Sequence, residues 1–431
     1  MRSALVLAAT VALATSAAQG CRSRRAPADD TTGSSGSAAS AGSAASATDL
    51  DGWRADLAFL AAELPKRHPA PFHQTPEAAF RAAVDELATA LPGLSDDQRL
   101  VGLARIVALV ADGHTQLDLG RYGRKLVYPL TFYWFPDGIF VIDAAEPYRW
   151  AIGARVVTVG DRSIAEATAA LSSTFGWQAD GFRRAQVAWR LAWPQFVRGT
   201  GLAPADGPAR YGVVDAGGAT RDLIVEPTVW RIKPPAPDTV PLYRQKPSAF
   251  YWSRYLPTER ALYVQYNTCY EASDLSFAAF TDAVTQALDS QPVDRLIVDL
   301  RWNGGGNSEI INPLLAAITA RPTLRGRVFA LIGRNTFSSA LMNAIDLDQV
   351  GALLVGEPAG SPAAHYGQVD HVDLPARGLT LHYSTRRFEA PGYAGPALAP
   401  EVAVELSSAD YLAGRDPVLA AALARPVPFA P

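Results

Sequence analysis

Three short apolar runs with helical patterns between them dominate the stretch from residue 295 to residue 358. The runs cover residues 296–300, 328–332 and 352–355, and each is followed by turn or polar residues. Each run has the length of a strand, and the residues between the runs repeat their apolar positions at helical spacing. Strand, helix, strand, helix, strand is the order of a buried parallel sheet covered by helices. We therefore expect this stretch to form the core of the fold.

Unusual residues follow two of these expected strands. The first strand precedes NGGGN at 303–307, where three consecutive glycines cost backbone entropy and suggest that N–H groups face something closely. The second precedes TFSS at 336–339, where a serine at a strand-to-helix turn exposes its hydroxyl near a helix N-terminus. A glycine-rich loop beside such a serine is the arrangement of an oxyanion hole. The alternative is that Ser338 only caps a helix, and the local pattern alone favours it because serine caps are common.

These motifs together resemble the C-terminal processing (tail-specific) protease family and its tricorn-core relatives. The resemblance rests on DLRWNGGG at 299–306, NTFSSA at 335–340 and VGEP at 355–358. LYVQYN at 262–267 and DGHT at 112–115 extend it, so that it covers approximately residues 52–420. It implies a ββα-spiral core related to the crotonases and serine-dependent peptide hydrolysis.

The resemblance also implies roles for particular residues. It aligns Ser338 with the family's nucleophile, leaving Ser339 as the lesser option, and the N–H groups of Gly305 and Ser339 would form the oxyanion hole. The tricorn-like branch has its catalytic histidine far upstream of the serine, in the position that His114 occupies here. A neutral imidazole activates serine, which is a weak nucleophile at its own pKa. The alternative for a lone histidine in a turn is a structural role.

The sequence departs from the family at one position. Many tail-specific proteases use a Ser–Lys dyad with the lysine a few residues after Gly-Glu-Pro, but that position is Pro362 and no lysine follows Lys246. Two interpretations remain: a Ser–His enzyme, or a protein that has kept the fold and lost the activity. His365 is the second candidate for the base, or a substrate-binding residue together with Tyr366 and Gly306.

A third group usually orients the imidazole of a Ser–His pair. The sequence does not place this group, for which three acidic residues are available: Glu357, Asp370 and Glu389. No HExxH spacing is present, and we expect neither a metal nor a cofactor. The formal net charge of −3 over 431 residues gives no basic footprint for nucleic acid.

The N-terminus is typical of an exported protein. One arginine, a short apolar run and small residues precede Cys21, which indicates a secretory signal peptide over residues 1–20 rather than a membrane span. The context of Cys21 resembles a bacterial lipoprotein processing site, with ordinary cleavage nearby as the alternative. Ser, Ala and Gly dominate residues 21–50, which we interpret as a flexible tether to the cell envelope.

The rest of the chain divides into three parts, and the fold class we expect is a multidomain α+β protein. Residues 51–119 repeat apolar positions at helical spacing and predict a helical module. Residues 120–235 predict a β-rich region that is partly PDZ-like, and a proline-rich linker at 233–241 precedes a tail-specific protease-like core at 236–431.

The preferred hypothesis is an exported, lipid-anchored serine peptidase that hydrolyses exported proteins or peptides through a Ser338 acyl-enzyme, with His114 as the general base. The alternatives are an inactive peptide-binding envelope lipoprotein on a protease-derived scaffold and an esterase or acyl-transfer enzyme. The expected partner is a peptide or unfolded protein, and contact with the membrane is expected only through the lipid anchor. The sequence predicts no oligomeric state.

Overall fold

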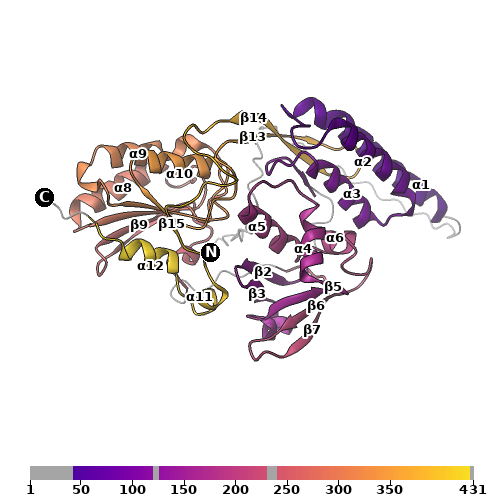
Figure 1. Cartoon of the computed structure of the whole chain (residues 1–431), viewed down its shortest axis with the longest axis horizontal. Coiled ribbons are helices and arrows are strands. Elements are labelled where there is room, and N and C mark those ends of the chain that lie inside the picture. The colour runs from indigo at the N-terminus through magenta and orange to yellow at the C-terminus, as the bar shows by residue number, and fades with distance from the viewer. Residues whose placement is uncertain (1–41, 120–125, 231–239, 428–431) are drawn as a thin grey trace, which may run out of the picture.

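The computed structural model describes residues 42–119, 126–230 and 240–427 of the chain (Figure 1). The expected signal peptide, Cys21, most of the expected tether and most of the proline-rich linker lie outside these residues. Export and lipidation therefore stay predictions from the sequence. Within the described ranges, no helix has the length and apolar character needed to cross a membrane.

The N-terminal part is a module of three helices, α1 (Gly42–Arg67), α2 (Glu77–Ala90) and α3 (Asp96–Ala108). The helix α1 begins inside the stretch expected to be a tether, where the sequence is rich in alanine, the best helix former. The capping box of Ser95 and Gln98 starts α3. The module has an apolar interior to which α1 contributes four buried side chains, those of Trp53, Leu57, Leu60 and Leu64.

The middle of the chain forms an antiparallel sheet in the order β2-β3-β4-β6-β7. Its strands are β2 (Leu130–Phe135), β3 (Gly138–Ala144), β4 (Arg155–Val159), β6 (Ala209–Val214) and β7 (Thr220–Val225), and β5 (Arg162–Ser163) pairs with β4. The region also contains helices. Between β5 and β6 the chain forms α4 (Ile164–Ser172), α5 (Asp180–Arg190) and α6 (Pro194–Gly199). Buried apolar side chains, such as those of Phe182 and Val187 in α5, pack these helices into the interior.

The C-terminal part is built on a second sheet, in the order β15-β12-β11-β10-β9-β8. Its strands are β8 (Tyr251–Leu256), β9 (Ala261–Tyr266), β10 (Arg295–Asp299), β11 (Val328–Ile332), β12 (Leu353–Gly356) and β15 (Val402–Ala403). The strands from β9 to β15 are parallel and only β8 is antiparallel. The three apolar runs are therefore adjacent parallel strands, as predicted.

Helices cover both faces of this second sheet (Figure 1). On one face, α8 (Phe277–Ser290), α9 (Asn312–Thr319) and α10 (Ser339–Gln349) pack on alternate strand residues such as Val298 and Ala330. On the other face, α12 (Pro417–Ala424) packs on Ile297 and Phe329. Two short helices, α7 (Leu242–Gln245) and α11 (Ser408–Leu412), complete this part.

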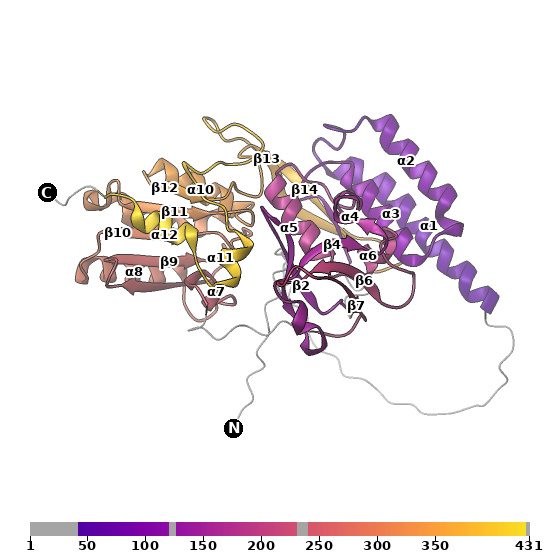
Figure 2. The ribbon, with the colours of Figure 1, turned by 60° about the horizontal axis from the view of Figure 1, so that its bottom comes forward.

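A long hairpin connects the C-terminal part with the helical module. Its strands are β13 (His365–Asp373) and β14 (Thr380–Phe388), and β1 (Gln116–Asp118) adds to β14 as a third strand. Figure 2 shows the hairpin between the two halves of the molecule. Its tip is fixed because the buried carboxylate of Asp56 in α1 accepts hydrogen bonds from the N–H groups of Ala376 and Arg377, at 2.8 and 3.0 Å. The hairpin therefore brings the DGHT motif, which directly precedes β1, to the parallel sheet.

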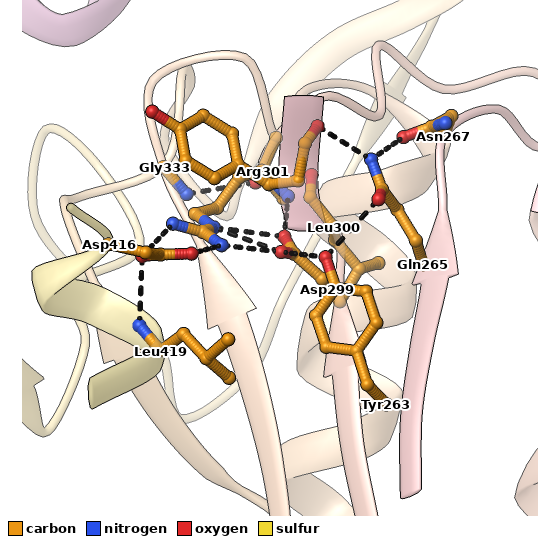
Figure 3. A network of polar contacts seen from close by, with 11 residues as sticks. Tyr263, Gln265, Asn267, Asp299, Leu300, Arg301, Gly333, Asp416 and Leu419 are labelled. Atoms are coloured by element: carbon orange, nitrogen blue, oxygen red, sulfur yellow. Dashed lines mark hydrogen bonds and ion pairs between the residues drawn. The ribbon is translucent and has the colours of Figure 1, made fainter. Parts of the chain in front are cut away.

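A buried ionic network fixes the chain where it leaves β10 (Figure 3). The guanidinium of Arg301 binds the carboxylates of Asp299 and Asp416, with shortest distances of 2.6 and 2.8 Å. The hydroxyl of Tyr263 donates to Asp299 at 2.7 Å. Because the two carboxylates share one cation and accept further hydrogen bonds, their burial is compensated. The network holds the start of the glycine-rich loop against α12.

Candidate active site

Ser338 lies in a strained turn between β11 and α10. Its backbone has φ 55° and ψ −129°, a conformation that residues other than glycine rarely adopt. It occupies the N-cap position of α10, but its side chain makes no capping hydrogen bond. This contradicts the simple interpretation in which Ser338 only caps the helix. A half-buried serine on a strained strand-to-helix turn is instead the arrangement that exposes a nucleophilic hydroxyl.

Hydrogen bonds tie this turn to the loop that follows β10. The N–H of Phe337 donates to the carbonyl of Asn303 at 3.1 Å, and the hydroxyl of Thr336 donates to the carbonyl of Leu300 at 3.0 Å. The hydroxyl of Ser339 donates to the carbonyl of Gly306 at 2.6 Å. The glycine-rich loop and the serine turn therefore form one rigid unit, as their positions after adjacent parallel strands predict.

Gly305 approaches Ser338 more closely than any other residue type would allow. Its φ is 108°, and a Cβ atom at this position would lie 2.7 Å from the Cβ of Ser338. The predicted use of its N–H in an oxyanion hole meets an obstacle, because this group already donates to the Oδ1 atom of Asn303 at 2.9 Å. The N–H of Ser339 lies in the first turn of α10, where N–H groups have no acceptor within the helix.

His114 lies directly beside the serine turn. Its imidazole stacks on the ring of Phe337 with centroids 4.3 Å apart, and on the imidazole of His365 at 5.4 Å. The His114 side chain is buried, and its Nε2 atom has no hydrogen-bond partner among the described residues. No hydrogen bond joins His114 to Ser338 in the described part of the chain. Catalytic hydrogen bonds are often long before substrate binds, so this geometry keeps the pair as a candidate.

Asp112 is the acidic residue nearest to the His114 imidazole, and it was absent from our candidates for the orienting group. Its Oδ1 atom lies 3.7 Å from Nδ1 of His114, a charge contact slightly beyond hydrogen-bonding distance, and accepts the His114 backbone N–H at 3.0 Å. Its Oδ2 atom accepts hydrogen bonds from the hydroxyls of Thr115 at 2.6 Å and Ser384 at 2.5 Å. Burial alone would raise the pKa of Asp112, but the contacts with His114 and His68 lower it well below its ordinary value. Asp112 is therefore a buried anion.

His68 is a second histidine on this carboxylate. Its Nδ1 atom accepts the N–H of Ala70 at 3.1 Å, so the ring proton is assigned to Nε2, which lies 3.3 Å from Oδ2 of Asp112. In this arrangement the N–H at Nε2 of His68 points to the carboxylate of Asp112. The carboxylate of Asp112 therefore lies between two imidazoles, those of His68 and His114.

The three acidic residues that the sequence made available have other partners. Glu357 binds the guanidinium of Arg334 with a shortest distance of 2.8 Å, and Asp370 accepts the hydroxyl of Tyr383 at 3.2 Å. The third residue, Glu389, is exposed and lies 3.2 Å from Arg387. The signal for Asp112 was present in the DGHT motif, two positions before the histidine.

His365 lies beside His114 but is poorly suited to act as the base. It is buried, and its Nδ1 atom lies 3.0 Å from the carbonyl of Ala363. Burial, together with the nearby His114, lowers the pKa of His365 to about 4. It is therefore neutral at neutral pH and a weaker base than an ordinary histidine.

A cavity of about 300 Å³ opens beside His365. Its lining includes both Tyr366 and His365, which the sequence predicted as substrate-binding residues, whereas Gly306 lies in the loop next to Ser339. The other lining residues are His73, Gln74, Gln178, Ala364 and Arg387. A second cavity, of about 40 Å³ near Arg334 and Glu357, is too small for a peptide side chain.

The chain shares its fold with mature CPAF. The crystal structure of mature CPAF matches with a TM-score of 0.61 and 13% sequence identity, over 84% of this chain and 94% of that chain. Mature CPAF complexed with lactacystin gives the same TM-score and identity over 85% and 96%. The photosystem II D1 C-terminal processing protease is a weaker match, with a TM-score of 0.38 and 16% identity over 84% and 93%.

By sequence, no protein-family model matches the chain, and no curated protein matches it either. The predicted α+β multidomain class is confirmed by the architecture and by the CPAF structures. An identity of 13% establishes a common fold, so the chemistry has to be argued from the site itself.

Proposed function

We propose that the chain is a serine-type peptidase with Ser338 as the nucleophile and His114 as the general base. The observation that carries this proposal is the strained turn of Ser338, whose side chain caps no helix and whose neighbour Phe337 packs against His114. Strain of this kind persists where the surrounding structure maintains it, and it is concentrated at functional sites. The common fold with CPAF agrees with this proposal but does not carry it.

The proposed reaction starts with attack on the peptide carbonyl. The Oγ atom of Ser338 bonds to the carbonyl carbon while Nε2 of His114 takes its proton. The anion of Asp112, 3.7 Å from Nδ1, stabilises the imidazolium that forms. His114 then gives the proton to the leaving amine, which leaves an ester on Ser338. Water hydrolyses this ester by the same sequence of proton transfers.

The oxyanion formed in this reaction needs hydrogen-bond donors. The N–H of Ser339, at the N-terminus of α10, is the first proposed donor. The N–H of Gly305 is the second, and it has to exchange Asn303 for the oxyanion when the substrate binds. Each donor contributes about 3 kcal/mol to transition-state stabilisation in enzymes where this has been measured.

Two observations support the second candidate, a peptide-binding protein without catalytic activity. Among the described residues no hydrogen bond joins Ser338 to His114, and the N–H of Gly305 is engaged by Asn303. Before catalysis, Ser338 would have to form a hydrogen bond with His114, and the N–H of Gly305 would have to leave Asn303. A scaffold that binds peptides in the cavity beside His365 without cleaving them would need neither change.

Labelling with an organofluorophosphonate separates the two candidates. The full-length protein is treated with the reagent and analysed by intact mass and peptide mapping, beside Ser338→Ala, His114→Ala and Ser339→Ala. We expect one adduct on Ser338 that disappears in the first two variants. The adduct should persist in Ser339→Ala, because this change keeps the backbone N–H. A well-folded wild-type protein without an adduct, or with an adduct on another serine, would overturn the proposal.

A further inference from the structure

The cavity beside His365 is formed at the base of the β13–β14 hairpin, next to the candidate catalytic residues. Strand pairing places Tyr366 directly opposite Arg387, and the guanidinium lies over the Tyr366 ring, 5.8 Å from its centroid. The preceding residue, His365, stacks on His114. The cavity is therefore separated from the serine turn by only two ring contacts, those of His114 with His365 and with Phe337.

The polar lining of this cavity favours a negatively charged ligand. Among the described residues that line it, Arg387 is the only permanently charged one, and none of them carries a carboxylate. The amides of Gln74 and Gln178 add neutral hydrogen-bond donors, and Ala364 is the one aliphatic residue in the described part of the lining. An apolar side chain placed here would remove water from these groups without replacing their hydrogen bonds.

Arg387 has donors available for such a ligand. Its Nε atom lies 3.2 Å from Glu389, an exposed pair of the kind that contributes little to stability. Its two terminal nitrogens donate no hydrogen bond to any of the described residues, although the carboxylate of Glu389 lies close to the guanidinium. The two terminal N–H groups of a guanidinium match the geometry of a carboxylate and bind it in a bidentate manner. Contact with the Tyr366 ring holds the planar group at the cavity.

We propose that this cavity is a substrate subsite that binds a carboxylate of the peptide, with Arg387 as its specificity-determining residue. The carboxylate is supplied by an aspartate or glutamate side chain or by the C-terminus of the peptide. The proposal names the substrate class of the proposed peptidase and thus rests on that function. Binding alone, however, is sufficient to test it.

The first test measures cleavage of matched peptides. One set of internally quenched peptides has blocked ends and differs only by Glu or Gln at successive positions, and a second, uncharged set ends in a free acid or an amide. We expect kcat/KM for the carboxylate member to be higher by about tenfold at one position or at the C-terminus. Arg387→Gln should remove this preference. Arg386→Gln should keep it, because Arg386 is not among the lining residues and its guanidinium packs over the ring of Phe388.

The position of the preference identifies the source of the carboxylate, and either source supports the proposal. Equal cleavage of all pairs by the wild-type protein would overturn it. A preference that persists in Arg387→Gln would also overturn it.

The second test measures binding in the Ser338→Ala protein, so that catalysis plays no part. Fluorescence anisotropy of the same peptides, labelled with a dye, should show tighter binding of the carboxylate members by about tenfold, and the added Arg387→Gln change should abolish the difference. Equal affinities for all members would overturn the subsite. If this preference holds while the fluorophosphonate adduct is absent, the subsite stands and the peptidase proposal fails. If Ser338 carries an adduct but the protein shows no carboxylate preference, the activated serine stands and the subsite proposal fails.

Discussion

The imidazole of His114 stacks on the ring of Phe337, the residue directly before Ser338, with the two planes inclined by 28°. Phe337 also stacks on Phe182 of α5 at 4.8 Å, so residues from three parts of the chain meet at this ring. In the proposed peptidase, this contact sets the position of the base relative to the nucleophile. It does so although the two residues belong to separate parts of the fold.

Shortening Phe337 should therefore slow the reaction of Ser338 more than it destabilises the protein. Phe337→Leu keeps an apolar side chain, and we expect a loss of about 1.5 kcal/mol or less in the free energy of unfolding. The rate of fluorophosphonate labelling should fall by about tenfold or more, because displacement of a catalytic group by 1 Å costs up to about a hundredfold. The matched control is Phe280→Leu in α8, which is equally buried and lies in the core of the second sheet. Equal labelling rates in the two variants would contradict this role.

Removing the charge of Asp112 should impair His114. In Asp112→Asn the neutral amide no longer stabilises an imidazolium, and we expect the rate of Ser338 labelling to fall by about a thousandfold or more. Near-ultraviolet circular dichroism distinguishes this loss from unfolding, which is a concern because Asp112 accepts several buried hydrogen bonds. Asp370→Asn, a change at an exposed carboxylate, is the control. A folded Asp112→Asn protein that labels within tenfold of the wild-type rate would refute the assignment.

Gly305 and Gly304 form a matched pair for testing the close approach to Ser338. An alanine at position 305 would place a Cβ atom 2.7 Å from that of Ser338, in a backbone conformation with φ 108°, whereas a Cβ atom at position 304 meets nothing within 4 Å. We expect Gly305→Ala to lower the free energy of unfolding by about 1–3 kcal/mol and to abolish labelling. Gly304→Ala should resemble the wild type in thermal unfolding and in labelling. Similar behaviour of both variants would show that the approach is less tight than the structure indicates.

The buried His365 should make stability depend on pH. Its pKa is lowered to about 4 in the folded protein, first by burial and then by His114, against about 6.5 in an unfolded chain. At pH values between these two pKa values, the unfolded state binds more protons than the folded state, so the free energy of unfolding rises with pH. From about pH 5 to pH 7 this group contributes a rise of about 2 kcal/mol.

Urea unfolding at the two pH values measures this rise. His365→Gln should lose that part of the pH dependence, whereas His371→Gln, a change at an exposed histidine, should keep it. A wild-type pH dependence in His365→Gln would show that His365 does not remain neutral in the folded protein.

The local patterns of the sequence predicted the elements of the site but not all of its contacts. The apolar runs before Asn303 and Thr336 predicted adjacent parallel strands, and this adjacency is sufficient to bring the glycine-rich loop to Ser338. Alternation in β13 and β14 predicted strands, but it does not reveal that their tip binds Asp56 in α1. Such contacts depend on the packing of distant segments, which local periodicity does not encode.

The same limit applies to the buried contacts of Asp112 and to the hydrogen bond of the Gly305 N–H group. The sequence placed Asp112 two positions before His114, but its burial depends on Ser384 and His68, which come from β14 and from the segment after α1. The N–H group of Gly305 donates to Asn303, only two residues away. The residue pattern, however, does not show whether this N–H group is bonded or free.

The most direct test of the proposed peptidase is cleavage of an unstructured protein by the full-length wild-type chain and by Ser338→Ala, purified side by side. Mass spectrometry of the products identifies each new terminus. We predict fragments with the wild-type protein and none with Ser338→Ala, at equal thermal stability of the two proteins. Equal fragments from both would contradict Ser338 as the nucleophile. An intact substrate with both proteins would favour the peptide-binding alternative.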